Sequence, residues 1–412
     1  GAPGHAYWQN SADYIIRVTL NEKENTVAGN IAITYTNNSP DPLDYLWLHL
    51  DQNIFKPGSR GANTAVYPGD NSDVTGEPNG GFKTGDITVS QGETNYTAHT
   101  ITNDTRMQVF LKKPMEPKGG KIIIKMNFSF AIPEDGAGRF GKQATRNGVI
   151  YQIAQWYPRM CVYDDVSGWN TLPYLGYGEF YLDYGNFDYY ITAPAEMFVF
   201  GSGDLQNPSD VLTGEQIKRL ERASNSDQTV MIVSAGETSS PSICPVKSGH
   251  LTWHFKMDNT REVAWAAGKG MIWDAAKVNV PSGKKVLAMS AYPVESDGKD
   301  AWGRSTEYLK AGMEFYSKQY FEFPWNTAVS SAGITDGMEY PGMIFDFYKE
   351  KGARLWFLIA HEIGHNWYPH IVGSNERRYM WQDESINTFI NHLATEEFNK
   401  GEYLNAPEFQ KK

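Results

Sequence analysis

The chain has 412 residues, a length that predicts two or three domains. Hydrophobic residues make up 41% of it and charged residues 21%, which is a globular composition and excludes a disordered chain. Its 37 basic and 48 acidic residues give a formal charge of -11 without any basic block, so we expect no nucleic-acid partner. We also expect no transmembrane segment, because the sequence contains no run of about 18 apolar residues.

The ends and the cysteines carry limited information about compartment. The start, residues 1–4, resembles a chain from which a leader has been removed, and on this ground we expect an exported protein, periplasmic or extracellular. Cys161 and Cys244 allow one disulfide bond. Two cysteines so far apart do not form a cysteine-rich zinc site.

The first two-thirds of the chain has the pattern of β-strands. Apolar residues occupy every second position in residues 14–20, 122–130 and 251–257, which is the period of a half-buried strand. Residues 57–82 are crowded with Gly, Pro, Asn and Asp, and this composition predicts a long surface loop that overhangs a cleft.

The pattern changes near residue 298. Apolar or aromatic residues lie four, seven and eleven positions after Leu309, on one face of a helix. This spacing predicts an amphipathic helix that ends before Pro324. A short extended segment is expected to follow, over residues 328–340.

Two further helices are expected toward the end of the chain. The first runs over about residues 352–368 and ends at Pro369. The second runs over about residues 383–400, with Asp383 as its N-cap.

This order of elements predicts an α+β multidomain protein. We expect an antiparallel β domain over residues 1–297 and a mainly helical domain over residues 298–412.

The motif with the clearest chemistry lies on the first of these two helices. His361 and His365 are four residues apart, so their rings share one face of the helix and can converge on one metal ion. Neutral imidazole nitrogens are ligands that zinc prefers. Glu362 lies about 100° further around the helix, where it can accept a proton from a water molecule at the ion.

A third ligand must come from another element. Glu384 is expected in the first turn of the next helix, and the connection from His365 is long enough for that helix to pack against the first. Its carboxylate would complete the protein ligands and leave one position open, as a catalytic zinc site requires.

Two plainer interpretations compete with a catalytic zinc site. One is a chance match on a surface helix, which occurs in about one such chain in a hundred. The other is a zinc ion that only stabilises the fold. Glu362 argues against the second, because a closed structural site needs no base.

Two motifs together resemble a known family. His-Glu-Ile-Gly-His at residues 361–365, followed by Trp-Gln-Asp-Glu at residues 381–384, resembles the gluzincin metallopeptidases. Gly-Met-Glu-Tyr-Pro at residues 337–341 resembles the Gly-x-Met-Glu-Asn motif of the membrane alanyl aminopeptidase family. The resemblance implies a β domain followed by a thermolysin-like catalytic domain, one Zn²⁺ per chain and peptide substrates.

The same resemblance implies roles for residues that bind substrate. Glu339 would bind the free α-amino group, Gly337 would contact the substrate backbone, and Gln155 would reach the first substrate pocket. A solvated carboxylate at a strand end is the plainer interpretation of Glu339. The chain departs from the family at Tyr340, where Asn is usual, and at Ser385, where Gly is usual, and both changes bear on the shape of the pocket.

One residue that the resemblance implies has no counterpart. The family places an oxyanion-stabilising tyrosine well beyond the third ligand, whereas this sequence ends at residue 412, so we expect a catalytic domain that is incomplete here and a poor catalyst. The rival expectation is that Tyr379 or Tyr403 takes this role.

The expected function is therefore a zinc-dependent aminopeptidase. A zinc endopeptidase or another zinc hydrolase is the first alternative. The second is a zinc-binding relative that is catalytically impaired or only binds.

Overall fold

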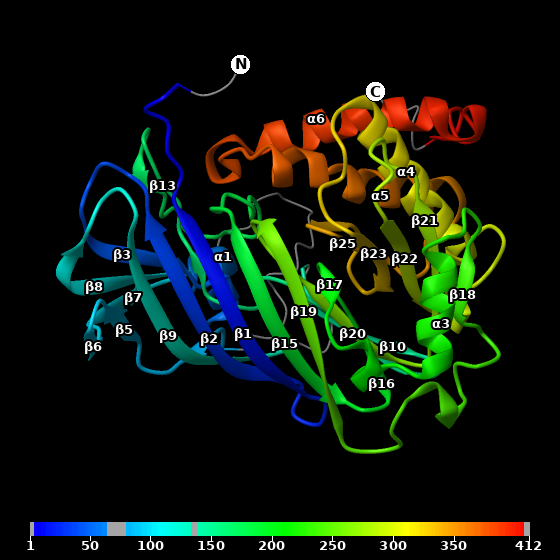
Figure 1. The fold of residues 1–412 in the computed structure, drawn as a ribbon, viewed down its shortest axis with the longest axis horizontal. Helices are drawn as coiled ribbons and strands as arrows, with labels where there is room; N and C mark the ends of the chain where they lie inside the picture. The colour runs from blue at the N-terminus through cyan, green and yellow to red at the C-terminus, as the bar shows by residue number, and fades with distance from the viewer. Residues whose placement is uncertain (1–3, 64–79, 133–138, 408–412) are drawn as a thin grey trace.

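The computed structural model describes residues 4–63, 80–132 and 139–407. Of the loop predicted over residues 57–82, residues 64–79 lie outside this range. The described chain is rich in β structure. A large sheet forms one half of the molecule, and a second sheet covered by helices forms the other (Figure 1).

The large sheet is built as the alternation predicts. The predicted strands at residues 14–20, 122–130 and 251–257 lie within β1, β9 and β19, and each buries alternate side chains. Neighbouring strands of the large sheet run antiparallel, except β1 and β15, which run parallel. Among described residues the strands of this sheet are, in order, β17 (Asp204–Leu205), β19 (His250–Thr260), β15 (Gly185–Pro194), β1 (Ser11–Asn21), β2 (Thr26–Asn37), β9 (Gly120–Ala131), β5 (Thr88–Gln91) and β6 (Thr94–Thr97), with β4 (Lys83–Thr84) also on β9.

The described residues also form three smaller sheets. The first has the order β10 (Gly141–Thr145), β11 (Gly148–Ile153), β20 (Trp265–Lys269) and β16 (Met197–Gly201). The second has the order β12 (Arg159–Met160), β3 (Leu43–His49), β8 (Arg106–Met115) and β7 (Thr100–Asn103). The third pairs β13 (Tyr163–Asp164) with β14 (Gly168–Trp169).

The sheet in the other half takes strands from both sides of residue 297. We call it the site sheet; its order is β18 (Val230–Val233), β21 (Met271–Val278), β22 (Val286–Pro293), β23 (Thr327–Gly333), β25 (Met343–Phe347) and β24 (Met338–Tyr340). The division at 297/298 stays a prediction, but it falls between β22 and β23, which pair in parallel.

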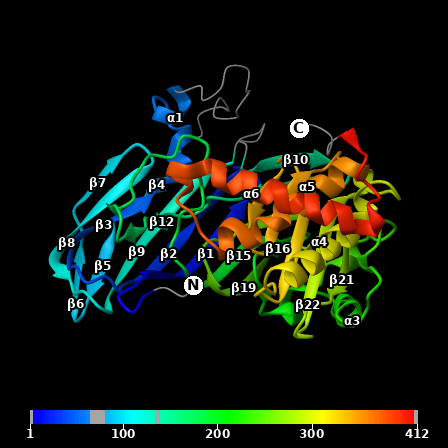
Figure 2. The same ribbon diagram turned by 90° about the horizontal axis from the view of Figure 1, so that it is seen from above.

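The helices gather mainly over the site sheet. Figure 2 shows α6 crossing the molecule, with its start toward the β-strands and its end beside α4 and α5. The α-helices are α1 (Arg60–Asn63), α2 (Pro208–Val211), α3 (Gly214–Ala223), α4 (Ser305–Gln319), α5 (Gly352–Gly364) and α6 (Glu376–Glu397). Short helical turns are η1 (Asp51–Phe55), η3 (Pro241–Ile243), η4 (Val294–Ser296), η5 (Trp302–Arg304), η6 (Asn366–Ile371) and η7 (Phe398–Lys400).

Two predicted helix boundaries were wrong. The helix predicted over residues 352–368 ends at Gly364, because Tyr368 is held in an extended conformation before Pro369. The next helix begins at Glu376, well before Asp383, and bends at Tyr379. Asp383 is therefore an interior residue of α6 and not its N-cap.

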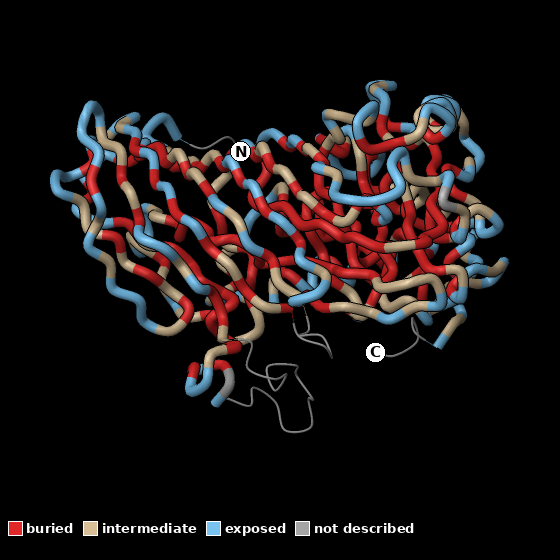
Figure 3. Tube along the Cα trace, turned by 90° about the horizontal axis from the view of Figure 1, so that it is seen from below, coloured by how far each residue is buried: buried red, intermediate tan, exposed pale blue. Residues whose placement is uncertain are grey.

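One hydrophobic core joins the two halves. It includes Tyr14 and Ile33 of the large sheet, Val329 of the site sheet and Ile359 of α5. Figure 3 shows buried backbone continuing from one half into the other. None of the helices in the described part of the chain is both long and apolar enough to cross a membrane. Cys161 and Cys244 are both free, so the disulfide that the sequence allows is absent between them.

Candidate metal centre

The helix α5 is positioned by an apolar stripe that runs along its length. Leu355, Ile359 and Ile363 recur every four residues and are fully buried, and α5 packs against α4, α6 and the site sheet. Burial of this stripe fixes which face of α5 turns toward the sheet. His361 and Glu362, near the end of the helix, are buried with it.

A stripe of polar residues on α6 fixes that helix against α5. Asn387 donates its side-chain amide to the backbone oxygen of His361 at 2.7 Å, and Asn391 donates to that of Phe357 at 3.1 Å. One turn further on, Thr395 accepts a hydrogen bond from the Trp356 indole at 2.9 Å. Because buried amides must be hydrogen-bonded, these contacts allow α6 only one register along α5.

The helices can approach this closely because residue 364 is glycine. A Cβ atom on Gly364 would lie 2.5 Å from Asn387 Oδ1 and 3.2 Å from the hydroxyl of Tyr316. That hydroxyl donates to the backbone oxygen of Ala360 at 2.9 Å, so α4 is bound to the same end of α5. Any larger residue at 364 would push one of these partners away.

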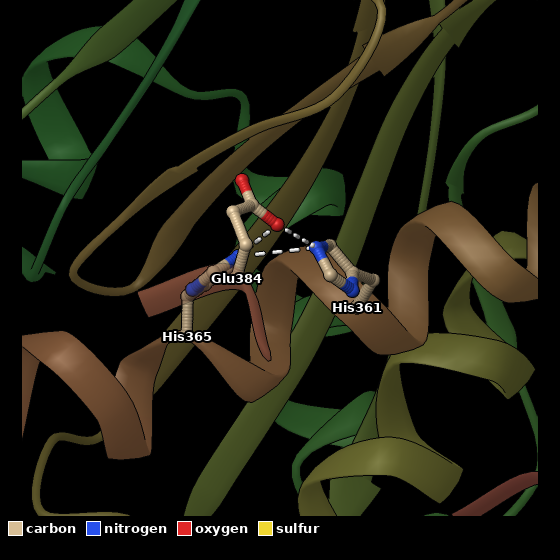
Figure 4. A group of neighbouring side chains, drawn as sticks. All are labelled: His361, His365 and Glu384. Carbon is tan, nitrogen blue, oxygen red and sulfur yellow. Dashed lines mark hydrogen bonds and ion pairs between the residues drawn. The ribbon is translucent and has the colours of Figure 1, made fainter. Parts of the chain in front are cut away.

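This packing brings His361, His365 and Glu384 together (Figure 4). The two Nε2 atoms of the histidines are 3.2 Å apart. Glu384 Oε2 lies 3.0 Å from Nε2 of His361 and 3.9 Å from Nε2 of His365. Glu384 was expected in the first turn of its helix, but it lies well inside α6, past the bend at Tyr379.

The three donor atoms fit a tetrahedral zinc ion. Nitrogens held about 2.0–2.1 Å from such an ion are about 3.3–3.4 Å apart, close to the separation of the two Nε2 atoms here. The two Nε2 atoms face each other. Two ring nitrogens at this separation repel unless a proton or a cation lies between them. Two imidazoles and one carboxylate are also a ligand set typical of catalytic zinc.

Asp383 supports this arrangement from behind, which the sequence analysis missed. Its Oδ1 lies 2.8 Å from Nδ1 of His365, and the backbone oxygen of Tyr368 lies 3.2 Å from the same nitrogen. A carboxylate behind a ligating histidine fixes the ring orientation and makes the imidazole a stronger donor. The sequence feature that could have indicated this role is that Asp383, an acidic residue, directly precedes the predicted ligand Glu384.

The candidate base and the candidate amine anchor share the same buried corner. Carboxylate oxygens of Glu339 and Glu362 and a ring nitrogen of His365 all lie within 4.8 Å of one another. Glu339 comes from β24, and Glu362 comes from α5. Both side chains are buried, so the plainer interpretation of Glu339 as a solvated carboxylate was wrong.

The local electrostatics favour a cation at this point. Burial raises the pKa of Glu339 to about 8, with Asp383 and Glu384 adding to the effect and His365 opposing it. Burial and the Glu339 carboxylate also raise the pKa of Glu362 well above its ordinary value. A hydrogen bond with His361 lowers the pKa of Glu384 to about 2. Several carboxylates in one buried corner are stabilised by positive charge.

Gly337 lies closer to the candidate base than the sequence indicates. Its φ of 86° falls in the left-handed region that favours glycine. A Cβ atom there would lie 2.6 Å from Glu362 Oε1 and 3.4 Å from Leu358. The residue thus leaves space for the Glu362 carboxylate, and its contact with a substrate backbone stays a prediction.

Gln155 is buried in the β-rich half, and its role in a substrate pocket also stays a prediction. Its φ of 44° turns the chain, and its backbone oxygen accepts a hydrogen bond from Gln52 at 3.1 Å. Gln152, on β11, instead reaches the site sheet. It donates to the backbone oxygen of Ser331 at 2.9 Å and accepts from the backbone of Thr335 at 2.9 Å.

The two candidate oxyanion tyrosines differ in position. The Tyr403 hydroxyl lies 2.7 Å from that of Tyr308 and accepts from Arg304 at 3.0 Å, beyond the C-terminal end of α6. Glu384 is separated from that end by thirteen helical residues, about 20 Å along the axis, so the expectation for Tyr403 was wrong. Tyr379 is 51% exposed at the bend of α6, and its role stays a prediction.

The fold is shared with zinc metallopeptidases of the M1 class. One similar structure is the crystal structure of an M1 zinc metallopeptidase from Deinococcus radiodurans, with a TM-score of 0.56, 13% sequence identity, and coverage of 96% of this chain and 73% of that one. A point mutant of the same enzyme gives a TM-score of 0.54 and 12% identity, with coverage of 95% and 72%. No protein-family model matches the sequence, and no curated protein matches it.

We predict that Gly364→Ala weakens zinc binding by displacing α6, because the new methyl group would overlap Asn387. Competition with a chromophoric chelator measures the affinity, and a loss of about 10–100-fold is expected, as for changes behind metal ligands. Gly214→Ala is the control, since a Cβ atom on Gly214 meets nothing within 4 Å. Unchanged zinc affinity in Gly364→Ala would show that the close approach is not needed.

Proposed function

We propose that this chain is a zinc-dependent aminopeptidase that hydrolyses the N-terminal peptide bond of peptides. The observation that carries the proposal is the convergence of His361, His365 and Glu384 beside the buried carboxylates of Glu362 and Glu339. The shared fold with M1 zinc metallopeptidases supports a peptidase, and the two sequence motifs support the aminopeptidase.

His361, His365 and Glu384 would hold one zinc ion. When bound, zinc supplies Lewis acidity, which polarises a carbonyl group and lowers the pKa of a water molecule. Glu362 adjoins the first ligand on α5 without being one of the three. We infer that it accepts the proton of the attacking water and then donates it to the leaving amine.

Glu339 would hold the free α-amino group of the peptide. A buried carboxylate attracts an ammonium strongly, and the charge of the ligand would offset the burial that raises its pKa. Because β24 is paired with β25 and packs against α5, the anchor stands at a fixed place relative to Glu362. Fixing the amine there selects cleavage after the first residue.

We further propose that α4, α5 and α6 with the site sheet form the thermolysin-like catalytic unit. The predicted segment 298–412 supplies its helices, and β18, β21 and β22 belong to it through the sheet.

For the metal, we predict that the purified protein contains about one zinc per chain. The double variant His361→Ala, His365→Ala should lose it, because two of the three donors are gone. Elemental analysis measures the content. His392→Ala is the control, since this histidine of α6 is 46% exposed and faces Glu396. Stoichiometric zinc retained by the double variant would reject this ligand set.

For the base, Glu362→Gln should keep zinc and lose about 10²–10⁴-fold in kcat, the usual contribution of general-base catalysis. Turnover of an aminoacyl fluorogenic substrate measures the loss in zinc-loaded protein. Glu397→Gln, an exposed carboxylate at the far end of α6, should retain full turnover. Wild-type turnover in zinc-loaded Glu362→Gln would disprove the role.

For the amine anchor, the wild type should cleave peptides with a free amino terminus and leave N-acetylated ones intact. Glu339→Gln should lower kcat/KM for free-amine substrates by about 10–100-fold, the effect of losing a hydrogen bond to a charged group, with zinc content unchanged. Equal cleavage of both substrates by the wild type would favour an endopeptidase or another zinc hydrolase. Zinc-loaded protein without turnover on either would favour an impaired relative.

A further inference from the structure

The residues between His365 and Glu384 are held by the β-rich half of the molecule. We call residues 366–383 the ligand connector, because they join the second candidate ligand to the third. The connector carries η6 and the first turns of α6. Its geometry therefore decides where α6 begins its path across α5.

Arg261, which follows β19, binds the first part of the connector. Its Nε donates to the backbone oxygen of His370 at 3.0 Å, and its Nη1 donates to that of Leu182. The guanidinium lies 4.1 Å from the ring centre of Tyr184, whose hydroxyl also donates to the backbone oxygen of His370 at 3.2 Å. Arg261 is only 8% exposed, so these bonds are shielded from water.

A glycine allows the connector to pass against this arginine. A Cβ atom on Gly373 would lie 2.6 Å from Nη2 of Arg261 and 2.7 Å from its central carbon. The backbone and the guanidinium are thus in direct contact, with no space for a side chain between them. Arg261 supports the connector by packing as well as by hydrogen bonds.

A second set of contacts holds the start of α6. Asn375 donates its amide to Asn170 Oδ1 at 2.8 Å. Glu376 accepts a hydrogen bond from the backbone N–H of Phe180 at 3.1 Å. Both partners lie in the β-rich half, far from α6 in the sequence.

Arg377 then joins α6 to the interior of the β-rich half. Its Nη2 donates to Asp51 Oδ1 at 3.1 Å, and the guanidinium lies 4.8 Å from the ring centre of Tyr174. The other oxygen of Asp51 accepts from Arg159 at 2.6 Å, and Arg159 is fully buried against Glu262 as well. Asp51 is thus a fixed anchor and not a mobile surface group.

We propose that Arg261 and Arg377 are positioning residues of the metal centre. By fixing both parts of the connector to the β-rich half, they hold Glu384 where it can share one ion with His361 and His365. Without them the connector would gain conformational freedom, and ordering it again on metal binding would cost free energy. The inference rests on the proposed metal site and adds two arginines that do not belong to the group of the three candidate ligands, Glu362 and Glu339.

The test uses the protein with Arg261→Met and Arg377→Met, which remove the guanidinium donors and keep an unbranched apolar side chain. Competition with a chromophoric chelator should show zinc affinity reduced about 10–100-fold in each. The visible spectrum of the cobalt-loaded variants should change toward that of Glu384→Gln, which marks a loosened third ligand. Thermal unfolding of the metal-free proteins measures stability separately.

Arg304→Met is the matched control, because it acts on the other end of the same helix. Arg304 pairs with Glu307 of α4 and with Glu402 beyond α6, and its side chain is 21% exposed. It should lose stability and keep zinc affinity and the cobalt spectrum. Wild-type affinity in both connector variants, or an equal loss in Arg304→Met, would overturn the proposal.

Milder variants keep the test decisive if the methionine variants do not fold. Tyr184→Phe removes one hydroxyl donor and leaves the ring beneath Arg261. Arg377→Lys keeps the positive charge but loses the planar guanidinium with its several donors. Each should weaken zinc binding by a few-fold, and unchanged affinity in both would again overturn the proposal. A wild-type chain that binds no stoichiometric zinc would instead reject the proposed function.

Discussion

The hydrogen bonds between side-chain amides of α6 and backbone oxygens of α5 are the constraint on which the candidate metal centre depends. The oxygens of His361 and Phe357 each accept from an asparagine of α6. A movement of α6 that breaks both bonds would leave the Asn387 and Asn391 amides buried without partners, at a cost of about 1–3 kcal/mol each. The register of two helices, and with it the distance from Glu384 to the histidines, is therefore fixed by groups that need not touch the ion.

Charge is the second constraint on this corner of the molecule. Glu339, Glu362, Asp383 and Glu384 gather around two imidazoles, whereas Arg377 of α6 pairs with Asp51 of the β-rich half. Burial raises the pKa of Glu339 and of Glu362 and so favours their protonated forms. A divalent cation or a substrate ammonium would favour the ionised form of both carboxyl groups.

The sequence predicted the parts of this arrangement that depend on local spacing. Alternation located β1, β9 and β19, and the four-residue interval placed His361 and His365 on one face of α5. The convergence of Glu384 with these histidines agrees with the predicted ligand set, although the metal roles of all three stay predictions.

What the sequence did not predict depends on contacts between distant residues. Asp383 resembled an N-cap, but α6 starts earlier because Phe180 and Asp51 provide partners for Glu376 and Arg377. The resemblance pointed to Gln155, and only the folded chain shows that the nearby Gln152 contacts the site sheet. The boundary at residue 297 followed a change in local pattern, which carries no information about the pairing of β22 with β23.

That pairing has a consequence for the order in which the protein folds during synthesis. The hairpin of β21 and β22 is complete before β23 is made, so one edge of β22 has no partner while α4 emerges from the ribosome. An unpaired edge rich in apolar residues is a template for pairing with other chains. The nascent chain thus carries an open sheet edge while residues 293 to 327 are made, and helix α4, which packs on β21 and β22, can cover the face beside that edge before β23 arrives.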